Sequence, residues 1–160
     1  MVRQYKSEEK PLAIEITHPF KKRWGIRWNF EQKENMWYYV EKEFSTKPSL
    51  ELIKNTILDW YNQQTDQKIL SGFTWKNYPV WLSTENQFNY KAEYDLAVQT
   101  GGSTLPAKFK FGTTDAPQYH IFETVEELTD FYIKVVQYIR ECLNEGYAKK
   151  DAINWEEYEV

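Results

Sequence analysis

Large apolar residues alternate with polar ones in several short stretches of the chain, as they do in β-strands with one buried face. The clearest stretch, residues 24–31, places four of them on one side: Trp24, Ile26, Trp28 and Phe30. Residues 12–17 repeat the pattern with Leu12, Ile14 and Ile16, after a polar lead of ten residues. Residues 36–44 are rich in β-forming aromatics and are predicted to return as the second strand of a hairpin.

Two further hairpins are predicted downstream. Residues 73–76 and 80–82 flank Asn77, Tyr78 and Pro79, with Asn77 as the expected turn residue. Residues 107–111 alternate lysine with apolar side chains, and residues 118–122 are predicted to pair with them after a glycine- and proline-containing loop.

Spacings of three and four residues predict a helix after each hairpin. The first follows Pro48 and Ser49, and a polar run from Asn62 is expected to end it. The second begins at Ser83 or Thr84, turns Phe88, Ala92 and Leu96 toward the core, and ends at Gly101 and Gly102. The third begins at a capping box, Thr124 to Glu127, and runs to Gly146. Its apolar stripe comprises Leu128, Phe131, Val135, Tyr138, Ile139 and Cys142.

Strands and helices in this order predict an α+β fold, with an antiparallel sheet built from β-hairpins and helices packed on one face. Three hairpin–helix (ββα) units, or a coincidental repeat of that plan, both fit the pattern. We expect one domain over residues 1–160, with an N-terminal subregion of residues 1–67 and a second part of residues 68–155.

Charge and composition narrow the classes of partner. The 20 basic and 24 acidic side chains give a net charge of −4, and no basic cluster exceeds Lys21, Lys22 and Arg23, so nucleic acid is not an expected partner. The chain has one cysteine and no long apolar run. We therefore expect no membrane partner and a cytoplasmic protein, unless it is built into a larger particle such as a virion or tail.

Aromatic residues make up 18% of the chain, and two explanations compete for them. Most follow strand or helix spacing, which favours packing in the core. The alternative is an exposed patch around the 77–79 turn, formed by Trp75, Tyr78 and Trp81, that binds a sugar or another flat ligand. Strand alternation places Phe73 and Trp75 on one face, so at least one of these rings is expected in the core.

Few residues point to chemistry. His18 and His120 have no partner at metal-ligand spacing, so no metal site is expected. Cys142 lies on a predicted buried stripe, and no glycine pattern typical of a nucleophile elbow surrounds a serine. The paired acids Glu126–Glu127 and Glu156–Glu157 are better explained by helix capping and a solvated tail. We expect no catalytic residues and no cofactor.

The segments 69–98 and 105–153 carry a resemblance. The features that carry it are Gly72, Phe73 and Trp75 before a short hairpin, the polar residues Ser83, Gln87 and Asn89 at a helix start, Thr124 before a long aromatic helix, and Lys149 four residues before Ile153. Together they resemble a domain of unknown function in phage and prophage tail-fibre-region proteins. The resemblance spans about residues 68–153. Asn77 and Tyr78 depart from it, because a glycine is common at that turn. It implies a tail or fibre setting and no active site.

We therefore expect a non-enzymatic phage- or prophage-derived structural or assembly accessory protein that contacts other phage structural proteins. A small aromatic-lined glycan-binding module is the alternative. A third hypothesis is an enzyme whose site is assembled from scattered residues, which a deep pocket holding His120 beside a carboxylate would support. The sequence leaves the oligomeric state open.

Overall fold

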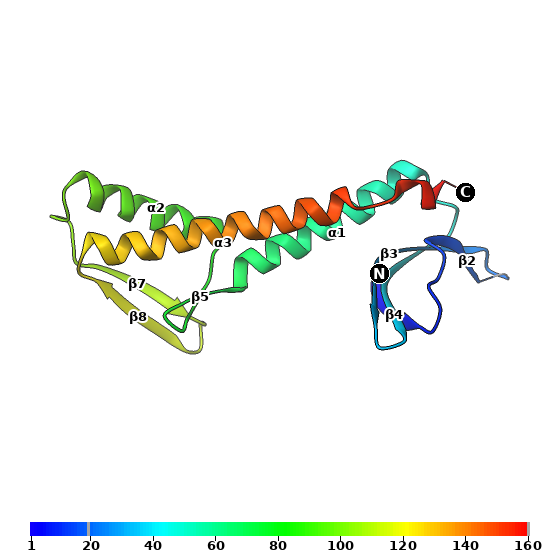
Figure 1. Cartoon of the computed structure of the whole chain (residues 1–160), viewed down its shortest axis with the longest axis horizontal. Coiled ribbons are helices and arrows are strands. Elements are labelled where there is room, and N and C mark those ends of the chain that lie inside the picture. Colours follow the sequence, from blue (N-terminus) through cyan, green and yellow to red (C-terminus); the bar gives the residue numbers. More distant parts are fainter. Residues whose placement is uncertain (19, 160) are drawn as a thin grey trace. The chain divides into compact units, whose positions relative to one another are not determined.

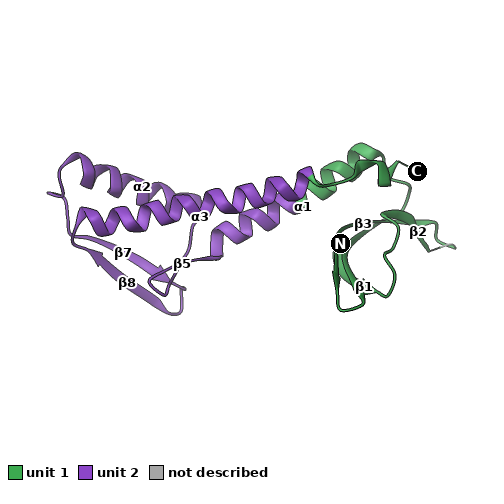
Figure 2. Ribbon diagram, in the orientation of Figure 1, with its two compact units in different colours: residues 1–60, 152–160 green, residues 61–151 purple. Residues whose placement is uncertain are grey.

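The chain forms two compact units in a computed structural model that describes residues 1–18 and 20–159. One unit comprises residues 1–60 and 152–160, and the other comprises residues 61–151 (Figure 2). The division falls inside helix α1 (Leu50–Ser71), seven residues before the predicted boundary at 67, and the C-terminal residues join the first unit.

The predicted α+β class and the three successive hairpin–helix segments are confirmed (Figure 1). In order, they are β3 (Arg23–Lys33) and β4 (Met36–Phe44) before α1; β5 (Phe73–Trp75) and β6 (Tyr78–Val80) before α2 (Thr84–Gln99); and β7 (Ala107–Gly112) and β8 (Pro117–Phe122) before α3 (Val125–Asp151). The strands form three separate antiparallel sheets, where the sequence predicts one. β5–β6 and β7–β8 are each two-stranded.

The sheet of the first unit has four strands in the order β1-β4-β3-β2, where β1 is Val2–Ser7 and β2 is Ile14–His18. β1 falls in the predicted polar lead. It forms because its backbone pairs with β4, for example Gln4 with Val40, while its side chains stay largely exposed. The expected inward face of residues 12–17 is partly wrong, because Ile14 is buried but Leu12 and Ile16 are exposed.

Residues of α1 and of the C-terminal 3-10 helix η1 (Trp155–Tyr158) complete the core of the first unit. Ile53 and Ile57 are buried together with Ile26 and Trp28 of β3. The Trp28 and Trp60 rings meet edge to face at 5.9 Å, and the Tyr158 hydroxyl donates a 2.6 Å hydrogen bond to the Arg27 carbonyl. The 3-10 helix η1 is thereby fixed to β3.

A buried ion pair lies in the same sheet. Arg27 Nε donates to Glu41 Oε2 at 2.6 Å, and Arg27 Nη1 donates to Glu15 and, at 3.1 Å, to the Leu12 carbonyl. Burial alone would lower the pKa of Arg27, but the hydrogen bonds to Glu15 and Glu41 raise it overall. The guanidinium is therefore charged, and its contacts with Glu15 and Glu41 link β3 to both of its neighbours in the sheet, β2 and β4.

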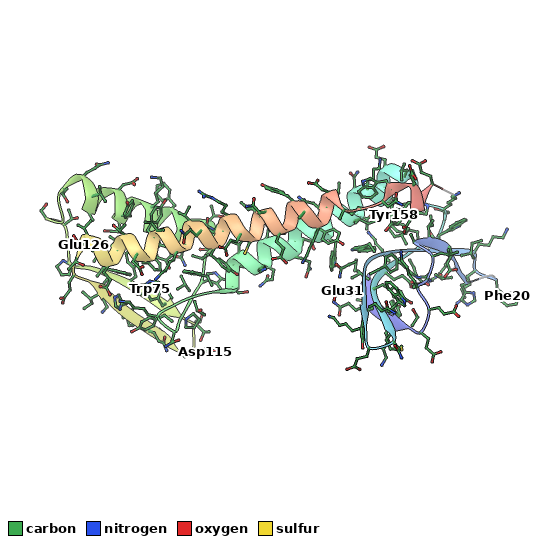
Figure 3. All side chains as sticks on the ribbon, viewed as in Figure 1. Phe20, Glu31, Trp75, Asp115, Glu126 and Tyr158 are labelled. Atoms are coloured by element: carbon green, nitrogen blue, oxygen red, sulfur yellow. The ribbon has the colours of Figure 1, made fainter. Side chains whose placement is uncertain are left out.

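The core of the 61–151 unit is mainly aromatic and is centred on Trp75, which is 2% exposed (Figure 3). Its ring lies 5.2 Å from the ring of Phe122 on β8 and 5.3 Å from that of Phe131 on α3. Phe109 and Phe111 of β7 complete this cluster. The explanation of the aromatic content by core packing therefore holds for most rings of this unit.

Local signals set the ends of most elements as predicted. Asn77 takes a turn position with φ +68°, next to Lys76 at +46°, and two such residues suit a two-residue hairpin turn. The Ser83 hydroxyl caps α2 by accepting from the Asn86 N–H, and the Thr124 hydroxyl caps α3 by accepting from the Glu127 N–H. Gly101, with φ +60°, follows the end of α2.

Two helices run further than predicted. α1 continues through its polar residues to Ser71, and α3 passes Gly146 to Asp151. Gly146 lies where a side chain would clash, because a Cβ there would stand 2.5 Å from Thr65 Oγ1 of α1. A glycine inside this helix therefore marks a close approach of α3 to α1. None of the helices in the described part of the chain has the length and apolarity needed to cross a membrane.

Gly146→Ala should destabilise the protein by about 1–3 kcal/mol, because the new methyl group overpacks against Thr65. Helix propensity favours alanine over glycine by about 1 kcal/mol. The double variant Gly146→Ala/Thr65→Ala removes the clash and should recover much of the loss. Urea unfolding followed by circular dichroism measures both; a single variant more stable than the parent would contradict the close approach.

Candidate functional site

The structure separates the three rings predicted to form an exposed patch. Trp75 is in the core, and the half-buried Tyr78 ring stacks on it at 6.5 Å. Trp81, just beyond β6, is 48% exposed. The predicted patch of Trp75, Tyr78 and Trp81 is therefore wrong, and only Trp81 is exposed. Trp75 and Tyr78 are paired across the hairpin, and both side chains point toward the core.

His120 lies beside a carboxylate, although the two residues share no recognisable motif. Its Nε2 is 3.1 Å from Oε1 of Glu127, in the first turn of α3. The same oxygen accepts a 2.6 Å hydrogen bond from Lys76 Nζ, at the turn between β5 and β6. The hydrogen bond from Lys76 is the main reason that the pKa of Glu127 is lowered from its ordinary value of 4.5, and the neighbouring His120 adds to it.

A second carboxylate of α3, that of Asp130, contacts the nitrogen-bearing edge of the Trp75 ring. The indole Nε1 donates to Asp130 Oδ2 at 3.1 Å, and Lys134 Nζ donates to the same carboxylate at 2.9 Å. Hydrogen bonds from Lys134 and then Trp75 lower the pKa of Asp130 below 3.8. We call Lys76, His120, Glu127, Asp130 and Lys134 the Trp75 polar rim.

Each member of this polar rim has a hydrogen-bond partner in the rim or in Trp75. Cys142 cannot serve His120 as a nucleophile, since it is buried and stands fifteen residues beyond Glu127 on the same helix, about 22 Å away. In the described part of the chain, no three His, Cys, Asp or Glu residues are placed to hold a metal ion. The cavities described next are lined by other residues.

Trp81 contributes to a surface cavity of about 430 Å³ in the 61–151 unit, which we call the Trp81 cavity. Its walls come from the end of β6, the start of α2, and β7 with the loop after it: Trp81, Asn86, Lys110, Phe111, Gly112, Thr113 and Thr114. The Asn86 amide is fixed by a 2.7 Å hydrogen bond to the Trp81 carbonyl, and Thr113 Oγ1 accepts from the Ala116 N–H. Lys110 is the only charged lining residue, so the cavity suits a neutral or anionic ligand.

Two other surface cavities are less suited to a specific ligand. One, of about 630 Å³, lies between α1 and the start of α2 and is lined mainly by amides and hydroxyls. The other, of about 310 Å³, lies on β1, β3 and β4 and includes Tyr5, Tyr38 and Tyr39. Neither has a tryptophan among its lining residues, and the only acid and base of the second, Glu31 and Lys33, pair with each other at 2.7 Å.

The apolar positions of α2 give the largest departure from expectation. Phe88, Ala92 and Leu96 were predicted to face the core, but all three are exposed, with Phe88 at 71% and Leu96 at 45%. Tyr90 and Ala97 face the core instead, and the Tyr90 ring packs 5.0 Å from Phe109 and 5.1 Å from Phe131. Phe88, Ala92 and Leu96 recur every four residues on one side of the helix. We call this exposed row the α2 stripe.

Sequence reasoning missed both surface features, although the spacing of residues in α2 held a signal for the exposed stripe. Lys110 belongs to a predicted strand and Thr113 and Thr114 to the loop predicted after it, and neither prediction links them to Trp81. For α2, Tyr90, Tyr94 and Ala97 also recur at three or four residues, so the helix had two candidate core faces.

No family model, curated protein or solved structure matches this chain. The resemblance to a phage tail-region domain therefore stays a prediction, and its residues carry no assigned roles.

Glu127→Gln should lower the free energy of unfolding at pH 7 by about 0.5–1 kcal/mol, since the ion pair with Lys76 lies near the surface. A carboxyl whose pKa is lowered in the native state stabilises the protein above its unfolded pKa, and this stabilisation fades as the pH falls below 4.5 through the native pKa. The difference between parent and variant should therefore vanish in acid.

Urea unfolding across that pH range measures this difference. Glu126→Gln is the matched control, because it removes the same charge from the exposed neighbouring position. Equal losses from both variants at pH 7 would show that helix charge, rather than the contacts of Glu127, is responsible.

Proposed function

We propose that this protein is a non-enzymatic accessory protein of phage or prophage origin that acts by protein contact in tail or fibre assembly. The observation that carries the proposal is the exposed α2 stripe. The resemblance of residues 68–153 to tail-region proteins supports the biological setting.

Phe88 is 71% exposed, so most of its apolar ring lies in water. Burying such a side chain stabilises a complex by roughly 1.5–3 kcal/mol. Aromatic residues surrounded by smaller apolar and polar groups are common at the energetic centre of protein interfaces. Phe88, with Ala92 one turn further along the helix and Asn89 and Lys91 around it, has this composition.

The state of the ionisable groups also supports a binding role. His120, Glu127 and Asp130, the groups closest to an acid–base arrangement, are engaged in holding Trp75 and the β5–β6 turn. A general acid or base needs a free lone pair or proton directed at a substrate. Their hydrogen bonds instead join β5, β8 and α3.

Phe88→Glu should reduce capture of tail or fibre components by at least tenfold, because it puts a charge in place of the ring that a partner would bury. The measurement is co-purification with the tagged full chain from induced lysates, followed by identification of the bound proteins. Ile133→Glu adds the same charge at another exposed apolar position, on α3, and should not change capture. Capture of no tail component by the parent protein would count against the proposal.

Carbohydrate binding at the Trp81 cavity is a second candidate. An exposed indole can stack on the apolar face of a sugar ring, while the Asn86 amide, Lys110 and the two threonines offer groups that bind hydroxyls. This candidate depends on Trp81 and not on Trp75 or Tyr78.

Trp81→Ala should abolish any sugar binding, since the stacking platform is removed. A glycan array identifies the ligand, and the change in tryptophan fluorescence on titration measures its affinity. Tyr119→Ala removes another exposed aromatic ring, on β8 outside the cavity, and should leave binding unchanged. An array without hits for the parent chain would eliminate the candidate.

A further inference from the structure

One positive charge borders the Trp81 cavity, and the protein does not neutralise it. Lys110 lies on β7 between Phe109 and Phe111, and because those two rings are buried in the core, its side chain projects from the outer face of the strand. Within the described part of the chain, Lys110 forms no ion pair, no hydrogen bond and no contact with an aromatic ring. Its ammonium group is therefore available to a ligand.

The neighbouring lysine on the same face is already engaged. Lys108 lies two residues before Lys110 and projects from the same side of β7. Its Nζ stands 4.5 Å from the centre of the Tyr119 ring on β8, and it does not line the cavity. Of these two exposed lysines, one contacts a ring of the protein and the other borders the cavity.

Acidic groups do not contribute to the wall of the cavity. Its seven lining residues include neither Asp nor Glu. Glu85 and Asp115 are next in the chain to the lining residues Asn86 and Thr114, but both are exposed and outside the wall. Because Glu85 offsets the positive end of the α2 dipole, Lys110 is the charge that selects a ligand.

Polar groups with spare hydrogen-bonding capacity lie beside this charge. The Asn86 amide nitrogen binds the Trp81 carbonyl, while its Oδ1 accepts no hydrogen bond from the described residues. The Thr113 hydroxyl accepts from the Ala116 N–H and keeps its own proton to donate. An acceptor and a donor next to an exposed indole suit a ring that carries hydroxyl groups.

The charge decides between an acidic and a neutral sugar. A ligand that fills the cavity takes water away from the Lys110 ammonium group, and this costs free energy unless a partner replaces the water. A neutral sugar offers only hydroxyl groups, whereas a carboxylate or sulfate offers the opposite charge and a stronger hydrogen bond. Lysine acts as a point charge, so it suits either anion.

We propose that the Trp81 cavity binds an acidic sugar, whose ring stacks on Trp81 and whose carboxylate or sulfate pairs with Lys110. This inference rests on the carbohydrate-binding candidate proposed above, because it names the class of sugar for the same site. An acidic peptide would also satisfy Lys110. Its carboxylates, however, bring neither a ring face for the indole nor hydroxyl groups for Asn86 and Thr113.

A glycan array that pairs each acidic glycan with its neutral form tests the class of ligand. Glycans containing uronic or sialic acid are printed beside their methyl esters, and sulfated glycans beside their desulfated forms. The tagged full chain should bind acidic members about three- to tenfold more tightly than their neutral forms, as expected for one ion pair near the surface. The two kinds of pair distinguish a carboxylate from a sulfate. Equal binding to both members of every pair, or no binding at all, would overturn the proposal.

Lys110→Gln should lower the affinity for an acidic glycan about three- to tenfold, to that of its neutral form, because it removes the charge and keeps a polar side chain. The affinity for the neutral form should not change. Lys108→Gln is the matched control, since it removes the same charge from the same face of β7 outside the cavity. Titration followed by tryptophan fluorescence compares the parent and both variants. Equal losses from the two variants would show a general effect of positive charge and contradict the pairing with Lys110.

A poly-glutamate peptide tests whether the site responds to charge alone. The peptide should bind more weakly than the acidic glycans, and Trp81→Ala should abolish binding of the glycans. A peptide that binds as tightly as they do, and that Trp81→Ala does not affect, would replace the sugar by an acidic protein segment and overturn the proposal.

Failure of this inference can be distinguished from failure of the proposed functions. Equal binding of acidic and neutral sugars through Trp81 would keep the carbohydrate candidate and remove the role of Lys110. An array without hits would remove both. Capture of tail components through Phe88 is measured separately, so it stands or falls independently of the cavity.

Discussion

Trp75 is the side chain on which the 61–151 unit depends. β5 and β6 have only three residues each, and an isolated two-stranded hairpin of that length is not stable. The indole ring joins this hairpin to Phe122 of β8 and Phe131 of α3, while its N–H binds Asp130. One side chain thus links three elements that do not share a sheet.

The Trp75 polar rim follows from the same constraint. A tryptophan buried to its edge needs a partner for Nε1, and the first turns of α3 supply carboxylates that the helix N-terminus also stabilises. Glu127 and Asp130 lie three residues apart, on one side of α3, and reach Lys76, His120 and Trp75. His120, Glu127 and Asp130 therefore contribute to the packing of Trp75, and the Trp81 cavity and the α2 stripe are formed by other residues.

Sequence reasoning succeeded where a few neighbouring residues decide the structure. Ser83 and Thr124 cap helices, and Asn77 turns a hairpin, because these roles depend on contacts within three or four residues. It failed where distant residues decide. β1 exists only because β4 offers an edge, and α2 turned Tyr90 inward, although Phe88 is the more apolar ring, because Tyr90 reaches Phe109 and Phe131. The walls of the Trp81 cavity come from three separate segments, so spacing along the chain could not place them together.

The orientation of α2 has an energetic consequence for function. Burial raises the pKa of Tyr90 to about 12, so its hydroxyl stays neutral and the core tolerates it. Phe88, which could have filled the same space without a hydroxyl, stays in water. Because residues two apart lie on nearly opposite sides of an α-helix, burying Tyr90 places Phe88 on the exposed side of α2.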